Sequence, residues 1–584
     1  MRPEYVPFAP MVAISIGLLT GCGGGAGSTP SNLPPQSGPV SISVSPTSAT
    51  VAAGSTKQFA ATVSNTSNTT VTWQVDGVTG GSATVGTISS TGVYTAPLSP
   101  PSVGQVPVTA ISGADSTKSA SATVTPVFSN ASVSGSYVFK AVTIGSTGFA
   151  FTAGVFNADG NGHIIAGIED ANDATNGPRT NIAFTGMYSV GSDGRGSATA
   201  STTLGTSIFK FVLISNTSAE LIEFDNTAAS GFVSAQDPSA ISSISRTFVF
   251  AFQGEDADSM TFLGPASSVG QIVLNGSGAV SGILDVNERG TFSANVPFTG
   301  NYTIGPQGRG TAVSAASYGM STYVFYIVNA KTIEFLNVDP IPGLIETGTA
   351  VAQQSVSFGN GSLGSSVFLL SGGDAPTGTT LVAAGRFDTD GAGNIQNGVV
   401  DENDNGVFSD SLPLSGGSYS IASNGRGTIS ATTAKGTLTF VFWLTSQGNA
   451  QLIESDTFGA ASGTVLPQQS GSFSDSSMQG NFAFALGGAS GSQPFAGLGQ
   501  VASNGVGGFT GNEDINAGGS TVPNVAFTGT YSIGQNGHGT GTVNSVRTTP
   551  VRVLLINQSS AVFISADPGE PLIGLAEKQC SDCH

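Results

Sequence analysis

The chain has 584 residues, which is more than one hydrophobic core organises, so several domains are expected. Its formal net charge of −19 repels polyanions, and this excludes nucleic acid as a partner, because binding it needs clustered Lys and Arg. With 82 glycines and only 9% charged residues, the composition favours short strands and tight turns over helices. We therefore expect an all-β, multidomain protein.

Residues 1–22 are typical of an export signal. Arg2 precedes a mostly apolar run over residues 6–19, and Leu-Thr-Gly-Cys follows, ending at Cys22. This tetrapeptide resembles the lipobox of bacterial lipoproteins, which implies lipid attachment to Cys22, a membrane as partner, and an outer-membrane or cell-surface location. An ordinary secretory signal or a short anchor is the alternative. Residues 23–39 are dense in Gly, Ser and Pro and predict a flexible tether.

Residues 40–126 alternate apolar and polar residues in short runs separated by turns, which predicts a β-sandwich. The segments GSTKQFAATV, VTWQV and GVYTAP resemble the bacterial immunoglobulin-like group 2 domain. The resemblance implies a spacer or a binding module without catalytic residues. Trp73 is expected to anchor the core between the sheets, beside Phe59, Val63 and Val75.

From residue 128 onward a block of about 114 residues recurs four times, over 128–240, 241–358, 359–472 and 473–577. Each copy carries a G-x-x-D-x-N box and then a box of the form F-T-G-x-Y-x-x-G-x-x-G-x-G, which the third copy varies. The boxes place Asp170, Asn172, Asp285, Asn287, Asp401, Asn403, Asp514 and Asn516 at equivalent positions. One structural unit is therefore duplicated, and because each copy is large enough to fold singly, we expect beads rather than a solenoid.

The first copy contains about eight apolar runs, and Asp-Gly and Asn-Gly turns separate them. Such turns between alternating runs are the strongest short-range hairpin signals. Consecutive hairpins form an antiparallel meander, so each repeat is predicted to be a small up-and-down barrel. A sandwich, and less favourably a pair of propeller blades, are the alternatives.

The repeated Asp and Asn have two possible roles. A structural role would have the Asp accept backbone N–H groups of the following loop, or form an Asx turn at a strand end. A functional role would place these residues at one rim of each barrel, to bind a cation or a sugar hydroxyl; we favour structure. Arg195, Arg309 and Arg426 share one turn position, but His538 replaces them in the fourth copy. That exchange suits a solvated turn residue better than a ligand contact.

Asp388 and Asp390 begin a D-x-D-G-x-G segment that resembles a calcium loop. The other copies keep the Gly-x-Gly turn but lose these carboxylates, which favours a plain hairpin over a calcium site.

The sequence contains no recognisable catalytic constellation. His163 and His538 lie in turns away from any nucleophile motif, and Glu169-Asp170 and Glu513-Asp514 point to opposite faces of a strand. We therefore expect a protein that is not an enzyme.

The last residues, 578–584, contain Cys580, Cys583 and His584 in the C-x-x-C-H pattern. This pattern matches the attachment motif of c-type cytochromes, which implies a covalent haem. A disulfide, free thiols or a metal site are the alternatives. The leading hypothesis is a lipid-anchored, non-enzymatic surface protein with a spacer and four modules that bind a surface glycan or a protein. An electron-transfer lipoprotein with haem at the last motif is the second hypothesis, and a secreted hydrolase the weakest.

Overall fold

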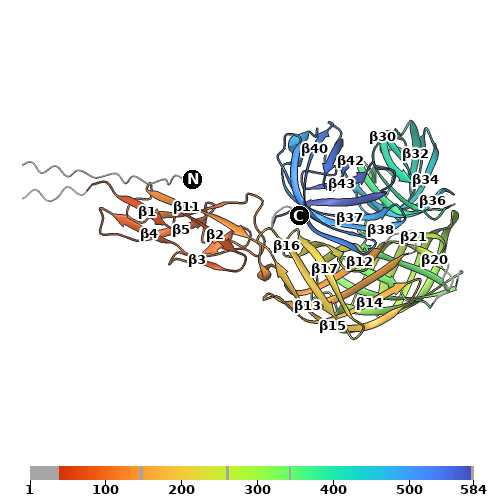
Figure 1. The fold of residues 1–584 in the computed structure, drawn as a ribbon, viewed down its shortest axis with the longest axis horizontal. Helices are drawn as coiled ribbons and strands as arrows, with labels where there is room; N and C mark the ends of the chain where they lie inside the picture. The colour runs from red at the N-terminus through yellow and green to blue at the C-terminus, as the bar shows by residue number, and fades with distance from the viewer. Residues whose placement is uncertain are drawn as a thin grey trace, which may run out of the picture.

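The computed structural model describes residues 38–143, 149–257, 262–317, 319–340, 343–375, 377–404 and 406–580. Nearly all regular structure is strand, so the prediction of an all-β protein is confirmed. The structure shows a sandwich domain followed by four eight-stranded units, which we call barrels 1 to 4 (Figure 1). Among the described residues there is no helix with the length and apolarity needed to cross a membrane.

The sandwich domain contains eleven strands in two main sheets, ordered β2-β11-β10-β5-β6 and β3-β9-β8-β7, with a separate β1-β4 pair. Its strands are β1 (Ser41–Ser45), β2 (Ser48–Ala52), β3 (Thr56–Gln58), β4 (Ala60–Ser64), β5 (Val71–Val75), β6 (Val78–Thr79), β7 (Gly81–Ser82), β8 (Gly86–Ile88), β9 (Val93–Thr95), β10 (Val106–Ser112) and β11 (Ser119–Val127). Trp73, Phe59 and Val75 pack in one core cluster, and Val63 is also buried. The alternating pattern therefore produces the expected sandwich, whose inner face is apolar.

Barrels 1, 2 and 4 are closed antiparallel meanders of consecutive strands. Barrel 1 consists of β12 (Ser134–Thr143), β13 (Ala150–Asp159), β14 (His163–Asp173), β15 (Arg179–Val190), β16 (Arg195–Ser201), β17 (Thr206–Leu213), β18 (Ser218–Glu223) and β19 (Ser230–Ala235). Barrel 2 consists of β20 (Ser245–Ala257), β21 (Phe262–Asn275), β22 (Ala279–Glu288), β23 (Thr291–Ile304), β24 (Arg309–Ala316), β25 (Gly319–Asn329), β26 (Thr332–Asn337) and β27 (Gly343–Ala352). Barrel 4 consists of β37 (Gly480–Ser490), β38 (Gln493–Ser503), β39 (Gly508–Ala517), β40 (Ser520–Ile533), β41 (His538–Asn544), β42 (Thr548–Leu555), β43 (Ser560–Ser565) and β44 (Leu572–Lys578). The barrel, rather than the sandwich or propeller, is the correct alternative for these repeats.

Barrel 3 differs at one seam, where its fourth strand is broken in two. Its strands are β28 (Ser366–Asp374), β29 (Thr380–Thr389), β30 (Ile395–Asp404), β31 (Val407–Pro413), β32 (Gly416–Ile421), β33 (Arg426–Thr433), β34 (Gly436–Ser446), β35 (Asn449–Glu454) and β36 (Gly459–Pro467). They form a nine-stranded sheet with β31 and β32 at its ends, and a single bridge joins Asn394, next to β30, to Ser418 in β32. The second box has one more residue here than in the other copies, between Leu414 and Tyr419. An extra residue in a strand interrupts its ladder, which explains the break.

Four short 3-10 helices precede or connect strands: η1 (Asn130–Ser132), η2 (Pro306–Gly308), η3 (Asn360–Ser362) and η4 (Asp475–Met478). Each barrel interior is filled in part by aromatic side chains at alternate strand positions. In barrel 1, for example, Phe139 contacts Phe156, Phe184 and Phe209. The period of two in a strand directs the residues between these outward.

The outward residues bury apolar surface between neighbouring barrels. Val138, Val155 and Tyr326 belong to one cluster between barrels 1 and 2. Three further clusters join barrels 2 and 3, barrels 3 and 4, and barrels 4 and 1. The four barrels therefore form a closed ring, in which barrel 4 returns to barrel 1 (Figure 1). The expectation of separate beads is wrong, because each barrel has apolar residues on its outer as well as its inner face.

Candidate functional site

The repeated Asp occupies a β-bulge and lies in the interface between two barrels. In each barrel the register between the third and fourth strands shifts at this residue. One carboxylate oxygen of Asp285 accepts the backbone N–H of Asn295 at 2.9 Å, and Asn295 has a φ of 56°. The same bond links Asp170 to Asn181, Asp401 to Ser411 and Asp514 to Asn524. The carboxylate thus stabilises a left-handed residue that is costly without support.

The same carboxylate also contacts an Arg or His side chain of the next barrel. Arg309 Nη2 lies 2.6 Å from Asp170, Arg426 Nη2 lies 2.7 Å from Asp285, and His538 Nε2 lies 2.7 Å from Asp401. The series closes where Arg195 Nη2, in barrel 1, lies 2.6 Å from Asp514 in barrel 4. We call these four pairs the clamps. These Arg and His side chains are 14–19% exposed, so the expectation that they are solvated turn residues is wrong. Each turn instead places its Arg or His against the Asp of a neighbouring barrel.

Aromatic donors complete two of the clamps. Tyr326 donates its hydroxyl to Asp170, and Trp443 Nε1 donates to Asp285 at 3.0 Å. Burial and the Asp170 carboxylate hold the pKa of Tyr326 well above its usual value. A carboxylate that accepts several N–H and O–H groups can remain ionised although it is buried.

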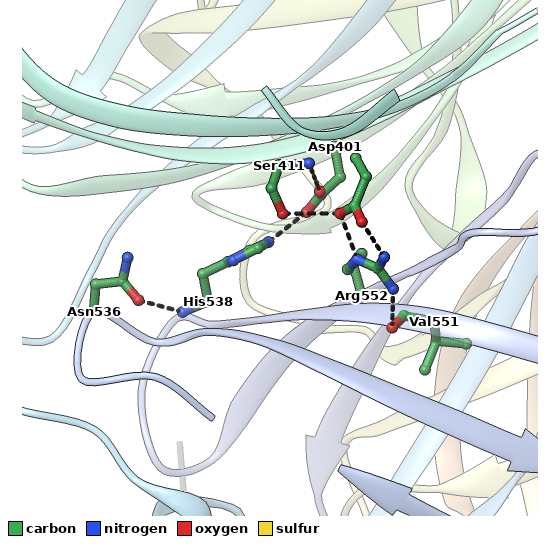
Figure 2. A network of polar contacts seen from close by, with 7 residues as sticks. Asp401, Ser411, Asn536, His538, Val551 and Arg552 are labelled. Carbon is green, nitrogen blue, oxygen red and sulfur yellow. Dashed lines mark hydrogen bonds and ion pairs between the residues drawn. The ribbon is translucent and has the colours of Figure 1, made fainter. Parts of the chain in front are cut away.

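The third clamp, between barrels 3 and 4, has a different composition (Figure 2). His538 contacts Asp401, while Arg552 binds the adjacent Asp410 through Nε at 2.8 Å and Nη2 at 2.5 Å. Ser411 joins the two carboxylates, since its N–H donates to Asp401 and its hydroxyl to Asp410. A second ion pair therefore accompanies the one clamp in which histidine replaces arginine.

The repeated Asn is fully buried and also binds the next barrel. Asn287 Nδ2 donates to the carbonyls of Glu454, Asp456 and Gly459 at 2.8–3.0 Å, in the hairpin between the seventh and eighth strands of barrel 3. Asn403 and Asn516 do the same in barrels 4 and 1, and Asn172 donates to Asn337 in barrel 2. The box therefore holds the ring together through both of its polar residues.

Sequence reasoning missed a glutamine that follows the last strand of each barrel. Gln236, Gln353, Gln468 and Gln579 each donate Nε2 to two carbonyls of the next barrel. Gln579, for example, donates to Leu213 in barrel 1 at 2.6 Å. The signal was present, because a Gln recurs after the eighth strand in all four copies.

The segment that resembles a calcium loop has the contacts of a hairpin turn. Asp390 Oδ1 accepts the backbone N–H groups of Ala392, Gly393 and Asn394, and Asp388 contacts Arg386 and Ser365. The Asn394 side chain, which donates to Asp390, and then these backbone N–H groups lower the pKa of Asp390 to about 2. In the described part of the chain, no group of three or more His, Cys, Asp or Glu is arranged to hold a metal.

At the other end of the chain, Cys580 is buried and disulfide-bonded, and its N–H donates to Ile214 of barrel 1 at 3.1 Å. Cys22, Cys583 and His584 lie outside the described residues. Lipid attachment and a haem therefore stay predictions.

A second group of polar residues lies inside the barrels. We call the mouth the end of each barrel at which the first, third, fifth and seventh strands end. Barrel 2 holds a cavity of about 480 Å³ that reaches the mouth, lined by Phe250, Phe298, Phe335, Glu288 and Glu346 among others. Barrel 4 holds one of about 400 Å³, whose lining includes Phe484, Phe527 and Glu513. Apolar cavities of this size with a few polar groups are typical ligand sites.

No protein-family model matches the sequence, and no curated protein matches it. Among solved structures, intact Ap-TbpB (N and C lobes) matches with a TM-score of 0.17 and 10% identity, over 62% of this chain and 83% of that chain. The isotype 1 transferrin binding protein B from serogroup B Neisseria meningitidis matches with a TM-score of 0.16 and 11% identity, over 62% and 84%. A mutant transferrin binding protein B from Haemophilus parasuis Hp5 matches with a TM-score of 0.17 and 11% identity, over 62% and 83%. At these values the likeness assigns neither a family nor a function.

Proposed function

We propose that the chain is an exported binding protein, held at a bacterial outer membrane or cell surface through lipid on Cys22. In this proposal residues 23–39 are the tether, the sandwich domain is the spacer and the ring of barrels is the binding head, which acts without catalysis. The observation that carries the proposal is the closure of the ring with hollow barrels in it. Four barrels joined by four clamps form a rigid body, and rigid elements position a binding site better than linked beads do.

The position of the sandwich domain supports the role of spacer. It extends from one side of the ring (Figure 1). Polar contacts cross the junction: Ser99 donates to the Asn216 side chain of barrel 1 at 2.9 Å and accepts the Asn216 N–H at 2.6 Å, and Ser129 donates to Ala53 at 3.1 Å. A spacer that is held at its junction presents the head in a defined direction.

The alternative is electron transfer through a haem at Cys580, Cys583 and His584. No observation on the described residues favours it, since the Cys580 thiol is in a disulfide there. Production with haem-attachment machinery, followed by a test for a covalent Soret band, would decide between the two.

The main proposal is tested in cells by labelling with a radioactive fatty acid and by surface proteolysis. The wild-type chain should carry label and be cut in intact cells, while Cys22→Ser should carry no label and be released from the membrane. Ser28→Ala in the tether is the matched control and should behave as the wild type. A Cys22→Ser chain that stays in the membrane, or a wild-type chain without label, would overturn the proposal of a lipid anchor.

A further inference from the structure

Carboxylates lie inside the mouth of all four barrels, although burial there disfavours their charge. They include Glu169 and Glu223 in barrel 1, Glu346 in barrel 2, Glu454 in barrel 3, and Glu513 and Glu570 in barrel 4. Strand alternation sets the direction of Glu169, because its neighbour Asp170 points outward to Arg309. Burial raises the pKa of Glu169 and Glu346 to about 7 and that of Glu223 to about 8.

These carboxylates recur less regularly than the clamps do, since no position of the repeat carries a mouth acid in all four copies. Glu169 on β14 and Glu513 on β39 share one position of the box, and Glu223 on β18 and Glu454 on β35 share the last position of the seventh strand. Glu346 on β27 has no acidic counterpart in the other copies. A residue needed for folding recurs at one position of the repeat, as the clamp Asp does. An acid is nevertheless present at the mouth of every barrel, at positions that recur in at most two copies. Because burying an acid costs stability, this favours a demand of the site rather than of the fold.

In barrels 2 and 4 the acids lie beside the apolar cavities. Glu346 is 3% exposed and accepts the hydroxyl of Tyr323, and Glu288 and Asp256 line the same mouth. Glu513 is 8% exposed and accepts the hydroxyl of Ser545. Within the described ranges no Lys, Arg or His pairs with Glu346 or Glu513. Arg289 pairs with Asp256 and Glu288 in barrel 2, and Arg547 pairs with Glu570 in barrel 4. Each cavity therefore combines an apolar body with one acid, Glu346 or Glu513, that has no cationic partner among the described residues.

Further polar atoms at the mouths have no hydrogen-bond partner among the described residues. Ser267 lines the cavity of barrel 2, is 1% exposed, and its hydroxyl is unpartnered. In barrel 3, Glu454 Oε2 and Asp404 Oδ1 are buried and unpartnered. An unsatisfied buried polar atom costs free energy, which a ligand that supplies N–H donors recovers.

We propose that barrels 2 and 4 each bind one small apolar organic cation, with its hydrocarbon body in the barrel and its ammonium group among the carboxylates of the mouth. An ammonium group supplies three N–H donors and the positive charge that Glu346 and Glu513 lack. A carboxylate ligand would instead add a second negative group to an acidic mouth. The inference rests on the proposed binding function and gives its ligand class.

The test is calorimetric titration of the full chain carrying Cys22→Ser, without detergent, with n-octylammonium, n-octanol and n-octanoate. We expect n-octylammonium to bind at two sites, n-octanol to bind about tenfold more weakly or less, and n-octanoate to show no binding. Glu346→Gln and Glu513→Gln should each weaken one site about tenfold, and the double variant both. Asp115→Asn, an acid in the sandwich domain, is the control and should leave both sites unchanged.

Equal binding of n-octanol and n-octylammonium would overturn the role of the charge, and preferred binding of n-octanoate would reverse it. Absence of n-octylammonium binding to the wild-type chain would overturn the inference without any variant, so misfolding of a variant does not obscure the result. If lipid labelling and surface exposure persist while n-octylammonium fails to bind, the ligand class is wrong and the anchoring proposal stands.

Discussion

Removal of one clamp arginine should destabilise the whole ring. The Asp285 carboxylate is fully buried, and Arg426 contacts it through Nε at 2.9 Å and Nη2 at 2.7 Å. Arg426→Ala leaves this charge with the N–H groups of Asn295 and Trp443 alone. Removing one partner of a buried ion pair costs about 3–5 kcal/mol, and the two remaining donors place the expected loss near about 3 kcal/mol.

This loss of unfolding free energy corresponds to a measurable fall in the unfolding midpoint, Tm. Roughly 450 residues at about 2.1 cal/mol/K each give an unfolding entropy of about 0.95 kcal/mol/K, so a loss of about 3 kcal/mol lowers Tm by about 3 °C. Differential scanning calorimetry of the Cys22→Ser chain measures it. The matched control is Arg289→Ala, whose side chain is 47% exposed in its ion pair and should cost at most about 1 kcal/mol.

Two outcomes would refute this reasoning. Equal Tm values for Arg426→Ala and Arg289→Ala would show that the clamp does not stabilise the ring. A calorimetric trace in which one barrel unfolds separately, with the others unaffected, would show that the ring is not one cooperative unit. Arg426→Lys should fall between wild type and Ala, because Lys keeps the charge but not the two parallel hydrogen bonds.

Three further predictions follow from the same contacts. Burial, and then Asp225, raise the pKa of Glu223 from 4.5 to about 8. The contribution of Glu223 to stability is therefore complete below about pH 4.5 and is lost as the pH rises through about 8. Glu223→Gln should flatten the pH dependence of Tm between about pH 5 and 8, and an unchanged slope would contradict this. Deletion of residues 473–580 leaves the clamp partners Arg195 and Asp401 exposed at the two ends of a three-barrel chain, so light scattering should show concentration-dependent oligomers; a monodisperse monomer would argue against the interfaces. His538→Ala should lower Tm less than Arg426→Ala does, because the ion pair of Arg552 and Asp410 still joins barrels 3 and 4. The double variant His538→Ala with Arg552→Ala should lower Tm by more than the sum of the two single variants.

Much of the architecture could be predicted from local sequence alone. Hairpin turns and alternation are properties of neighbouring residues, and they lead from residue 128 onward to eight strands per repeat and to barrels. The broken strand of barrel 3 also has a local cause, the extra residue between Leu414 and Tyr419. The position of the repeated Asp beside a following backbone N–H is local as well, since Asn295 is ten residues from Asp285.

The ring could not be predicted in the same way, because its contacts join copies rather than neighbours. Asp170 and Arg309 are 139 residues apart, and Asp285 and Arg426 are 141 apart. The sequence repeat shows which residues are equivalent, but it does not show which copies contact one another. An Asp and an Arg that recur in every copy could therefore pair within one copy or between two copies. From the sequence, His538 in place of Arg was consistent with a variable residue in a solvated turn. Arg552 and Asp410 lie beside His538 only in the folded chain, so the sequence did not reveal the second ion pair of this clamp.

Closure also explains why two kinds of polar residue differ in how regularly they recur. A head-to-tail interface either closes or continues into a filament, so every copy must present the same partners at the same rotation. The clamp Asp, the buried Asn and the final Gln meet this condition in all four barrels, with Asp514, Asn516 and Gln579 reaching barrel 1. The backbone carbonyls of Glu223, Glu454 and Glu570 accept the Asn of a neighbouring barrel, but among the described residues no mouth carboxylate forms an ion pair with one. The side chains of the mouth acids are therefore not fixed by closure. The proposed binding accounts for an acid at every mouth, at positions that recur in at most two copies.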